Sequence, residues 1–98
     1  MKVLLICAAG MSTSLLVNNM KKFADADDTI EAYPVAQLEG IVDNYDVVLL
    51  GPQIRYKLKD VKKVTDAHGK PADVIDMRIY GQMKGKEAME MARKLYKQ

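Results

Sequence analysis

Cysteine is nearly absent from this chain of 98 residues, which has Cys7 and no other. A single cysteine excludes an internal disulfide and a Cys-x-x-Cys motif for disulfide exchange, and nothing in the sequence indicates an oxidising compartment. The chain also has one histidine, too few ligands for a convincing zinc site. We therefore expect a cytoplasmic protein that uses no metal and no cofactor.

Long apolar runs are absent as well. No run approaches the roughly 20 residues that a membrane span needs, so we expect no direct insertion into a membrane. The apolar stretch that ends at Cys7 is too short for the core of a secretory leader and has the length of a buried strand. The net charge of +2 comes from 15 basic and 13 acidic residues. Because the basic residues are dispersed, the sequence predicts no binding of nucleic acid.

Short apolar runs rich in Val, Ile and Leu are present, and most are bounded by Gly or Pro. Such runs are typical of strands that are buried on both faces of a sheet. A chain of this length is expected to form one domain, spanning residues 1–98. The predicted strands are Lys2–Cys7, Thr29–Tyr33, Asp46–Leu50 and Ala72–Asp76.

Helical spacing of apolar residues appears between these runs and after the last one. The alternation predicts an α/β domain with an open four-stranded parallel sheet, strand order 2-1-3-4, and helices on both faces. The crevice of such a sheet lies at the carboxyl ends of its first and third strands. We expect the loop after Cys7, the Gly51–Gln53 turn and an Arg78–Gly85 loop to meet there. The predicted helical faces are Leu16, Met20 and Phe23 within 12–26, the segment 35–42, Ile54 to Thr65, and Ala88, Met91, Ala92 and Leu95.

The segment after Cys7 has the composition of a loop that binds phosphate. Backbone amides converge at a helix amino terminus, so this place favours an anion and the thiolate form of a cysteine. Gly10 allows conformations closed to other residues. Small side chains let the backbone approach an oxyanion, and hydroxyls can bind its oxygens. The sequence thus predicts Cys7 as a nucleophile and a cradle formed by Ala8, Ala9, Gly10, Met11, Ser12, Thr13 and Ser14.

The same segment argues against hydrolysis. A cysteine-dependent phosphatase with this loop places an arginine six residues after the cysteine, where this chain has Thr13. No His, Asp or Glu lies within 7–14 to activate a water. Nucleotide-binding glycine motifs are absent too. A phosphoryl carrier therefore fits best. A phosphatase or arsenate-reductase-like enzyme and a non-catalytic module that binds anions or partners stay as alternatives.

These residues resemble a known family. Residues 7–16, CAAGMSTSLL, are similar to the phosphocysteine loop of the IIB components of bacterial sugar phosphotransferase systems (PTS), in the lactose/cellobiose family. The similarity continues through 31–34 (EAYP), 46–54 (DVVLLGPQI) and Tyr80-Gly81. It covers essentially the whole chain and implies a phosphatase-like phosphate-binding loop after the first strand.

The resemblance implies a relay of phosphoryl groups. A phosphohistidine on a IIA protein would phosphorylate Cys7, which would pass the group to a sugar entering through the membrane transporter IIC. Cellobiose or another β-linked disaccharide is the expected sugar. Gln53, Arg55, Arg78 and Tyr80 are candidate partner-binding residues near the crevice.

Two further residues of the chain bear on this reading. Family members often have an acidic residue where this chain has Lys84, which leaves the role of the 78–85 segment open. His68, the other candidate phosphoacceptor, precedes a turn at the far end of the sheet and is interpreted as a surface residue.

Overall fold

The sheet has the predicted topology. The computed structural model describes residues 1–7 and 13–97 of the chain. All neighbouring strands pair in parallel in the order β2-β1-β3-β4, which confirms the predicted fold class. The last strand ends two residues earlier than expected, at Val74. The strands are β1 (Lys2–Cys7), β2 (Thr29–Pro34), β3 (Val47–Leu50) and β4 (Ala72–Val74).

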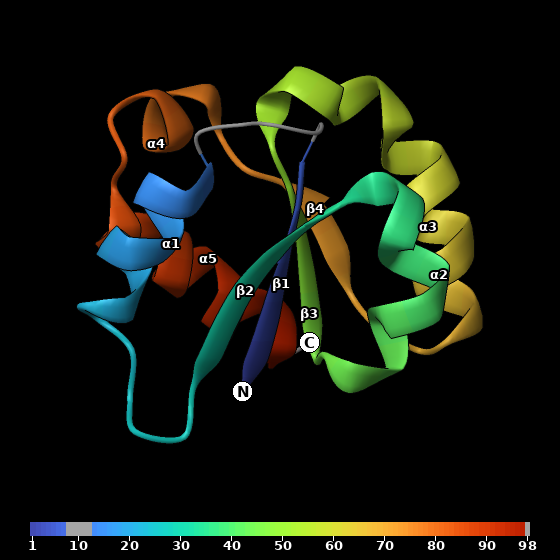
Figure 1. Cartoon of the computed structure of the whole chain (residues 1–98), viewed down its shortest axis with the longest axis horizontal. Helices are drawn as coiled ribbons and strands as arrows, with labels where there is room; N and C mark the ends of the chain where they lie inside the picture. Colours follow the sequence, from blue (N-terminus) through green and yellow to red (C-terminus); the bar gives the residue numbers. More distant parts are fainter. Residues whose placement is uncertain (8–12, 98) are drawn as a thin grey trace.

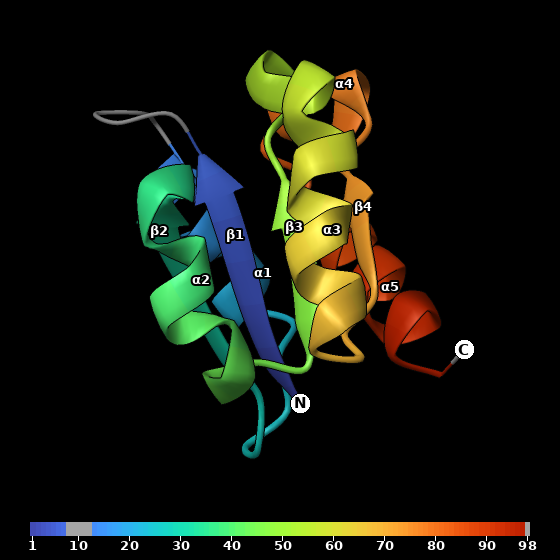
Figure 2. The ribbon, with the colours of Figure 1, turned by 90° about the vertical axis from the view of Figure 1, so that its right-hand side faces the viewer.

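Helices cover both faces of the sheet, as expected (Figure 1). Three of them, α1 (Thr13–Lys21), α4 (Met77–Gly81) and α5 (Gly85–Tyr96), lie on one side. The other side carries α2 (Leu38–Ile41) and α3 (Leu58–Ala67), which stand in front of the sheet in Figure 2. Short 3-10 helices extend this second layer: η1 (Val35–Gln37), η2 (Val42–Asn44) and η3 (Pro52–Lys57).

The core forms two layers, one on each face of β1. Val3 and Leu5 pack in the cluster that includes buried residues of α1 and α5, whereas Leu4 and Ile6 pack in the cluster on the α3 side. All four side chains are fully buried. Burial of each such side chain contributes roughly 1.5–3 kcal/mol, so β1 contributes strongly to the stability of the fold. Cys7 is the residue at the carboxyl end of this strand.

The first and last helices approach each other closely at Gly85. A Cβ atom at this position would lie 2.3 Å from the carbonyl carbon of Asn19. Only a glycine fits at such a distance, because no relaxation of side chains would relieve a clash with backbone. The Asn19 side-chain amide also donates a hydrogen bond of 2.9 Å to the carbonyl of Met83. These contacts hold α1 in place against α5. They therefore also position the amino terminus of α1, which follows the predicted loop.

The first helix is shorter than predicted, and the expected place of Phe23 on its buried face is wrong. The helix ends at Lys21, and Phe23 lies in the following turn with 47% of its surface exposed. An acidic segment stops the helix here. The carboxylate of Asp28 accepts the backbone N–H of Asp25 at 2.9 Å, which offers the backbone an alternative to helical hydrogen bonds.

The expected Arg78–Gly85 loop is also wrong, because residues 77–81 form helix α4. Asp76 begins this helix by accepting the backbone N–H of Arg78 through Oδ1 at 2.8 Å. Tyr80, which is only 5% exposed, anchors the helix in the core. A helix of five residues is too short to produce a periodic signal in the sequence.

Other helices differ from the predictions in detail. The segment 35–42 is divided between η1, α2 and the start of η2, which fits the low helix propensity of Gly40. In α5 the buried face is rotated relative to the predicted one. Met89 is fully buried, whereas Met91 is only partly buried. The contact of Gly85 with α1 accounts for this rotation, because residues 85, 88, 89 and 92 share one helical face.

Candidate active site at the carboxyl ends of the strands

Cys7 is the last residue of the central strand β1. It pairs in register with Pro34 of β2, and its Sγ lies 3.8 Å from the carbonyl oxygen of Tyr33. The side chain is largely covered, with the residue 8% exposed. A thiol in this position is held by β1 and β2 at the carboxyl ends of the strands, where parallel folds place their sites.

Helix α1 begins at Thr13, six residues after Cys7. Since the chain leaves β1 at its carboxyl end, the amino terminus of α1 returns to the same end of the molecule (Figure 1). The positive end of the helix dipole and its free backbone N–H groups favour negative charge there. Ser14, in the first turn of α1, is exposed. The remaining residues predicted for the cradle, 8–12, lie outside the described residues, so the cradle stays a prediction.

The end of β3 brings two further segments beside β1. Gly51, which follows β3, donates its backbone N–H to the carbonyl of Ile6 at 3.0 Å. A Cβ at Gly51 would lie 2.7 Å from Oε1 of Gln53 and 3.7 Å from Cε2 of Tyr80. Gln53 of η3 and Tyr80 of α4 therefore both lie beside Gly51, next to the strand that ends in Cys7. The third segment that the topology predicts to meet here, the loop after Cys7, lies outside the described residues.

A hollow of about 640 Å³ lies between η3 and α4. Arg55 crosses it, with Nη1 at 3.5 Å from the Sδ atom of Met77. Three of the four predicted partner-binding residues are in its lining, and Arg78 is exposed on the neighbouring turn of α4. The lining is formed by Pro52, Gln53, Arg55, Tyr56, Met77, Tyr80 and Gly81.

Tyr80 is placed differently from the other three. Its ring is buried in the core cluster on the α1 side, and among the described residues no group forms a hydrogen bond with its hydroxyl. A residue so deeply buried supports the wall of the hollow. Its contact with a partner therefore remains a prediction that this position does not favour.

Two sequence features lie away from this edge. His68 caps the carboxyl end of α3, and its Nδ1 lies 2.7 Å from Oδ1 of Asp43 at the opposite end of the sheet. Lys84 precedes α5 and lines a separate hollow with Asn19 and Phe23. Neither residue is among those around the Cys7 end.

Sequence reasoning missed Tyr56 and Met77. Both are exposed apolar side chains, at 74% and 63%, and both line the hollow. A signal for Met77 was present, because Asp76 is a good helix N-cap residue and indicates a helix that starts at residue 77. For Tyr56 there was none, because sequence periodicity does not show which residues a 3-10 helix leaves exposed.

A comparison of the sequence with models of protein families identifies the family of this chain. The family model described as "PTS system, Lactose/Cellobiose specific IIB subunit" matches residues 2–91. The chain belongs to this family. PTS IIB components are phosphotransferases that act in sugar uptake, and the predicted resemblance is confirmed.

Relatives support the assignment over almost the whole length. The chain is 40% identical to the oligo-beta-mannoside-specific EIIB component of Bacillus subtilis, over 93% of this chain and 91% of the relative. It is also 40% identical to the cellobiose-specific and galactose-specific EIIB components of Lactococcus lactis, in both cases over 95% of this chain and 94% of the relative.

Solved structures agree with the fold. The cellobiose-specific IIB component of Borrelia burgdorferi is similar with a TM-score of 0.82 and 39% identity, over 99% of this chain and 92% of that one. The lactose-specific IIB domain of Streptococcus pneumoniae has a TM-score of 0.80 at 20% identity, over 98% and 97%, which shows the shared fold. Among the described residues of this chain, no helix has the length and apolar character needed to cross a membrane.

Proposed function

We propose that Cys7 is the phosphoryl-carrying nucleophile of this IIB component and that the protein acts in the cytoplasm between a IIA protein and a membrane IIC transporter. One observation carries the proposal. In a chain of the IIB family, the single cysteine ends the buried central strand at the edge of the sheet to which the amino terminus of α1 returns. This edge combines a nucleophile with a site that favours an anion.

In the first step, the Cys7 thiolate attacks the phosphorus atom of a phosphohistidine on IIA. The S–P bond forms as the P–N bond breaks, and the imidazole nitrogen keeps the electron pair and takes a proton from solvent. The Sγ of Cys7 leaves its contact with the Tyr33 carbonyl, because a thiolate has no proton to donate. Backbone amides at the start of α1 and the predicted cradle, residues 8–14, would stabilise the charge on the transferring group.

In the second step, a sugar hydroxyl presented by IIC attacks the phosphorus atom of phospho-Cys7. The S–P bond breaks, the electron pair returns to the Cys7 thiolate, and the hydroxyl proton passes to a base on the transporter or to solvent. We propose cellobiose or another β-linked disaccharide as the sugar. Relatives named for cellobiose and for oligo-beta-mannosides support this substrate class.

The proposal can be tested by measuring intact masses. The wild type, Cys7→Ser and His68→Ala are incubated with the general PTS proteins, a matched IIA and phosphoenolpyruvate. We expect the wild type and His68→Ala to gain one phosphoryl group and Cys7→Ser to gain none. If Cys7→Ser still gains the phosphoryl group and His68→Ala does not, the phosphoacceptor is His68 and the proposal for Cys7 is wrong. If the IIA is phosphorylated but no variant accepts the group, the chain is a regulatory module.

A further inference from the structure

The hollow between η3 and α4 carries a second feature besides its place near Cys7. Tyr56 is 74% exposed and Met77 is 63% exposed, and they are among the few large apolar side chains that the described surface presents. Large exposed apolar groups that gather around one hollow mark an interaction site more often than scattered ones do. Here both residues line the hollow beside the end of β3.

The charged side chain that lines this hollow is basic, and the nearest acidic residue, Asp76, lies outside the lining. Arg55 and Arg78 are exposed on η3 and α4. None of the described lining residues is acidic. Asp76, which precedes α4, uses Oδ1 to accept the backbone N–H of Arg78. The thioether of Met77 is a weak acceptor, so its contact leaves the Arg55 guanidinium with donors to offer.

We propose that this hollow, lined by Arg55, Tyr56 and Met77, is the docking site for an apolar side chain of the phosphodonor protein IIA, and that the surrounding surface of IIA is acidic. This inference rests on the proposed function. An acidic partner that also brings a phosphoryl group is attracted by the two arginines before transfer. After transfer, the new negative charge on Cys7 offsets the arginines and weakens the hold on the same partner.

Charge also favours IIA over IIC as the protein that binds this hollow before phosphoryl transfer. The cytoplasmic loops of membrane proteins carry an excess of Lys and Arg, so a IIC transporter would face the unphosphorylated hollow with like charge. The sequence of events that follows is binding of an acidic IIA, phosphoryl transfer, release, and then approach to a basic transporter surface.

A pair of tyrosines provides the test. Tyr56 lines the hollow, whereas Tyr96, 52% exposed near the end of α5, lies at the other end of the sheet. The rate at which phosphorylated IIA phosphorylates Cys7 is measured as a function of IIA concentration for the wild type, Tyr56→Ala, Met77→Ala, Arg55→Glu and Tyr96→Ala. Thermal melting shows that each variant is folded, and sugar phosphorylation is followed separately with vesicles that contain IIC.

We expect Tyr56→Ala and Met77→Ala to raise the KM for IIA about tenfold, with little change in kcat, because truncated anchor residues lose binding energy of this order. Arg55→Glu should raise KM further and weaken its dependence on salt. Tyr96→Ala should match the wild type. Equal KM values for Tyr56→Ala and Tyr96→Ala would overturn the inference. Loss of sugar phosphorylation alone in Tyr56→Ala would also overturn it, by assigning the hollow to IIC. Failure of the wild type to accept phosphate would contradict the proposed function itself.

Discussion

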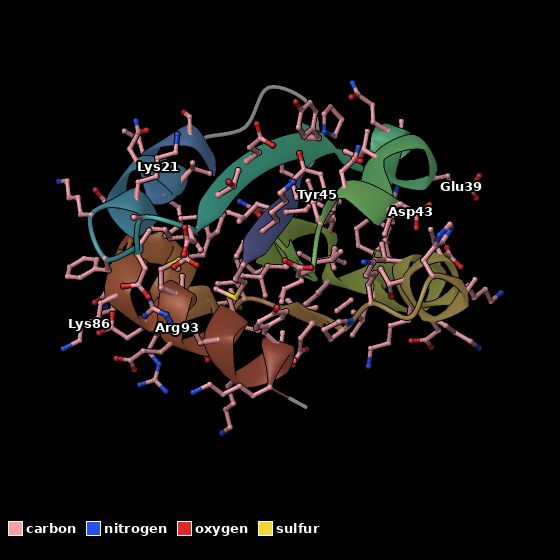
Figure 3. The ribbon with its side chains drawn as sticks, turned by 90° about the horizontal axis from the view of Figure 1, so that it is seen from below. Lys21, Glu39, Asp43, Tyr45, Lys86 and Arg93 are labelled. Atoms are coloured by element: carbon pink, nitrogen blue, oxygen red, sulfur yellow. The ribbon has the colours of Figure 1, made fainter. Side chains whose placement is uncertain are left out.

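The two ends of the sheet differ in how they use charge. At the amino end, Arg93 lies 3.6 Å from the carboxylate of Asp28, and the chain's N-terminal ammonium lies 3.3 Å from the same group. His68 and Asp43 form another pair there. Figure 3 views the molecule from this end, with Arg93 labelled beside α5. All the ion pairs formed by residues 1–7 and 13–97 lie at this end.

The carboxyl end has the opposite character. Arg55 and Arg78 are exposed there and belong to none of those ion pairs. Tyr56 and Met77 lie beside them and are more exposed than Tyr96 at the amino end. A surface optimised for stability would pair the charges and cover the apolar groups, whereas a surface that meets anionic partners keeps both accessible. The ion pairs thus gather at the amino end of the sheet, whereas the carboxyl end, which we propose as the recognition surface, keeps its arginines unpaired among the described residues.

The largest effect on function is expected for Cys7→Ser. We expect phosphoryl transfer to be lost completely, because an unactivated hydroxyl is a far weaker nucleophile than a thiolate. The free energy of unfolding should change by less than about 1 kcal/mol, because the substitution alters one atom at the edge of the core. Intact mass and denaturant unfolding measure the two quantities. A large loss of stability would show that the two ends are not separable.

The opposite behaviour is expected for Arg93→Met. The guanidinium donates a hydrogen bond of 2.8 Å to the carbonyl of Phe23 and lies beside Asp28, whose side chain is only 7% exposed. Removing it should cost about 1–2 kcal/mol of unfolding free energy, because covered acceptors lose their donor. Phosphoryl transfer should be unchanged. Lys94→Met, at an exposed neighbouring position of α5, is the matched control and should leave both quantities near wild type.

The pH dependence of stability should depend on Asp28. The backbone N–H of Asp25 lowers the pKa of Asp28, and the N-terminal ammonium and Arg93 act in the same direction against the effect of burial. A carboxyl with a lowered folded pKa stabilises the fold above its unfolded value of 3.8, and the contribution disappears as pH falls through the folded pKa. Unfolding free energies near pH 7 and near pH 3 should therefore differ less in Asp28→Asn than in the wild type. Asp27→Asn, at an exposed position, should keep the wild-type difference.

The smallest effect is expected for His68→Ala. The contact between His68 and Asp43 is short, but the Asp43 side chain is 74% exposed and solvent screens the pair. Its removal should change the unfolding free energy by about 0.5 kcal/mol or less. A loss above about 1 kcal/mol would mean that an exposed pair at the amino end contributes as much as the covered one at Asp28.

The strands and the place of Cys7 could be predicted from the sequence, because buried parallel strands leave continuous apolar runs and their order limits where a site can form. The proposed recognition surface could not be predicted in full. Its helix α4 is held by the Asp76 cap and by burial of Tyr80, which are tertiary features without a periodic signal. The exposure of Phe23 was missed for a similar reason, because the turn at Asp25 ends α1 before the apolar pattern does.

The most direct test of the account compares nitrogen–proton NMR spectra of the protein before and after phosphorylation by IIA. We predict that the backbone signals that shift belong to the carboxyl end: Cys7, the first turn of α1, the Gly51–Arg55 segment and α4. Signals of Asp28, His68 and Arg93 should stay in place. Shifts of comparable size at the amino end, or an unmoved carboxyl end in a protein shown by mass to be phosphorylated, would contradict the division between the two ends.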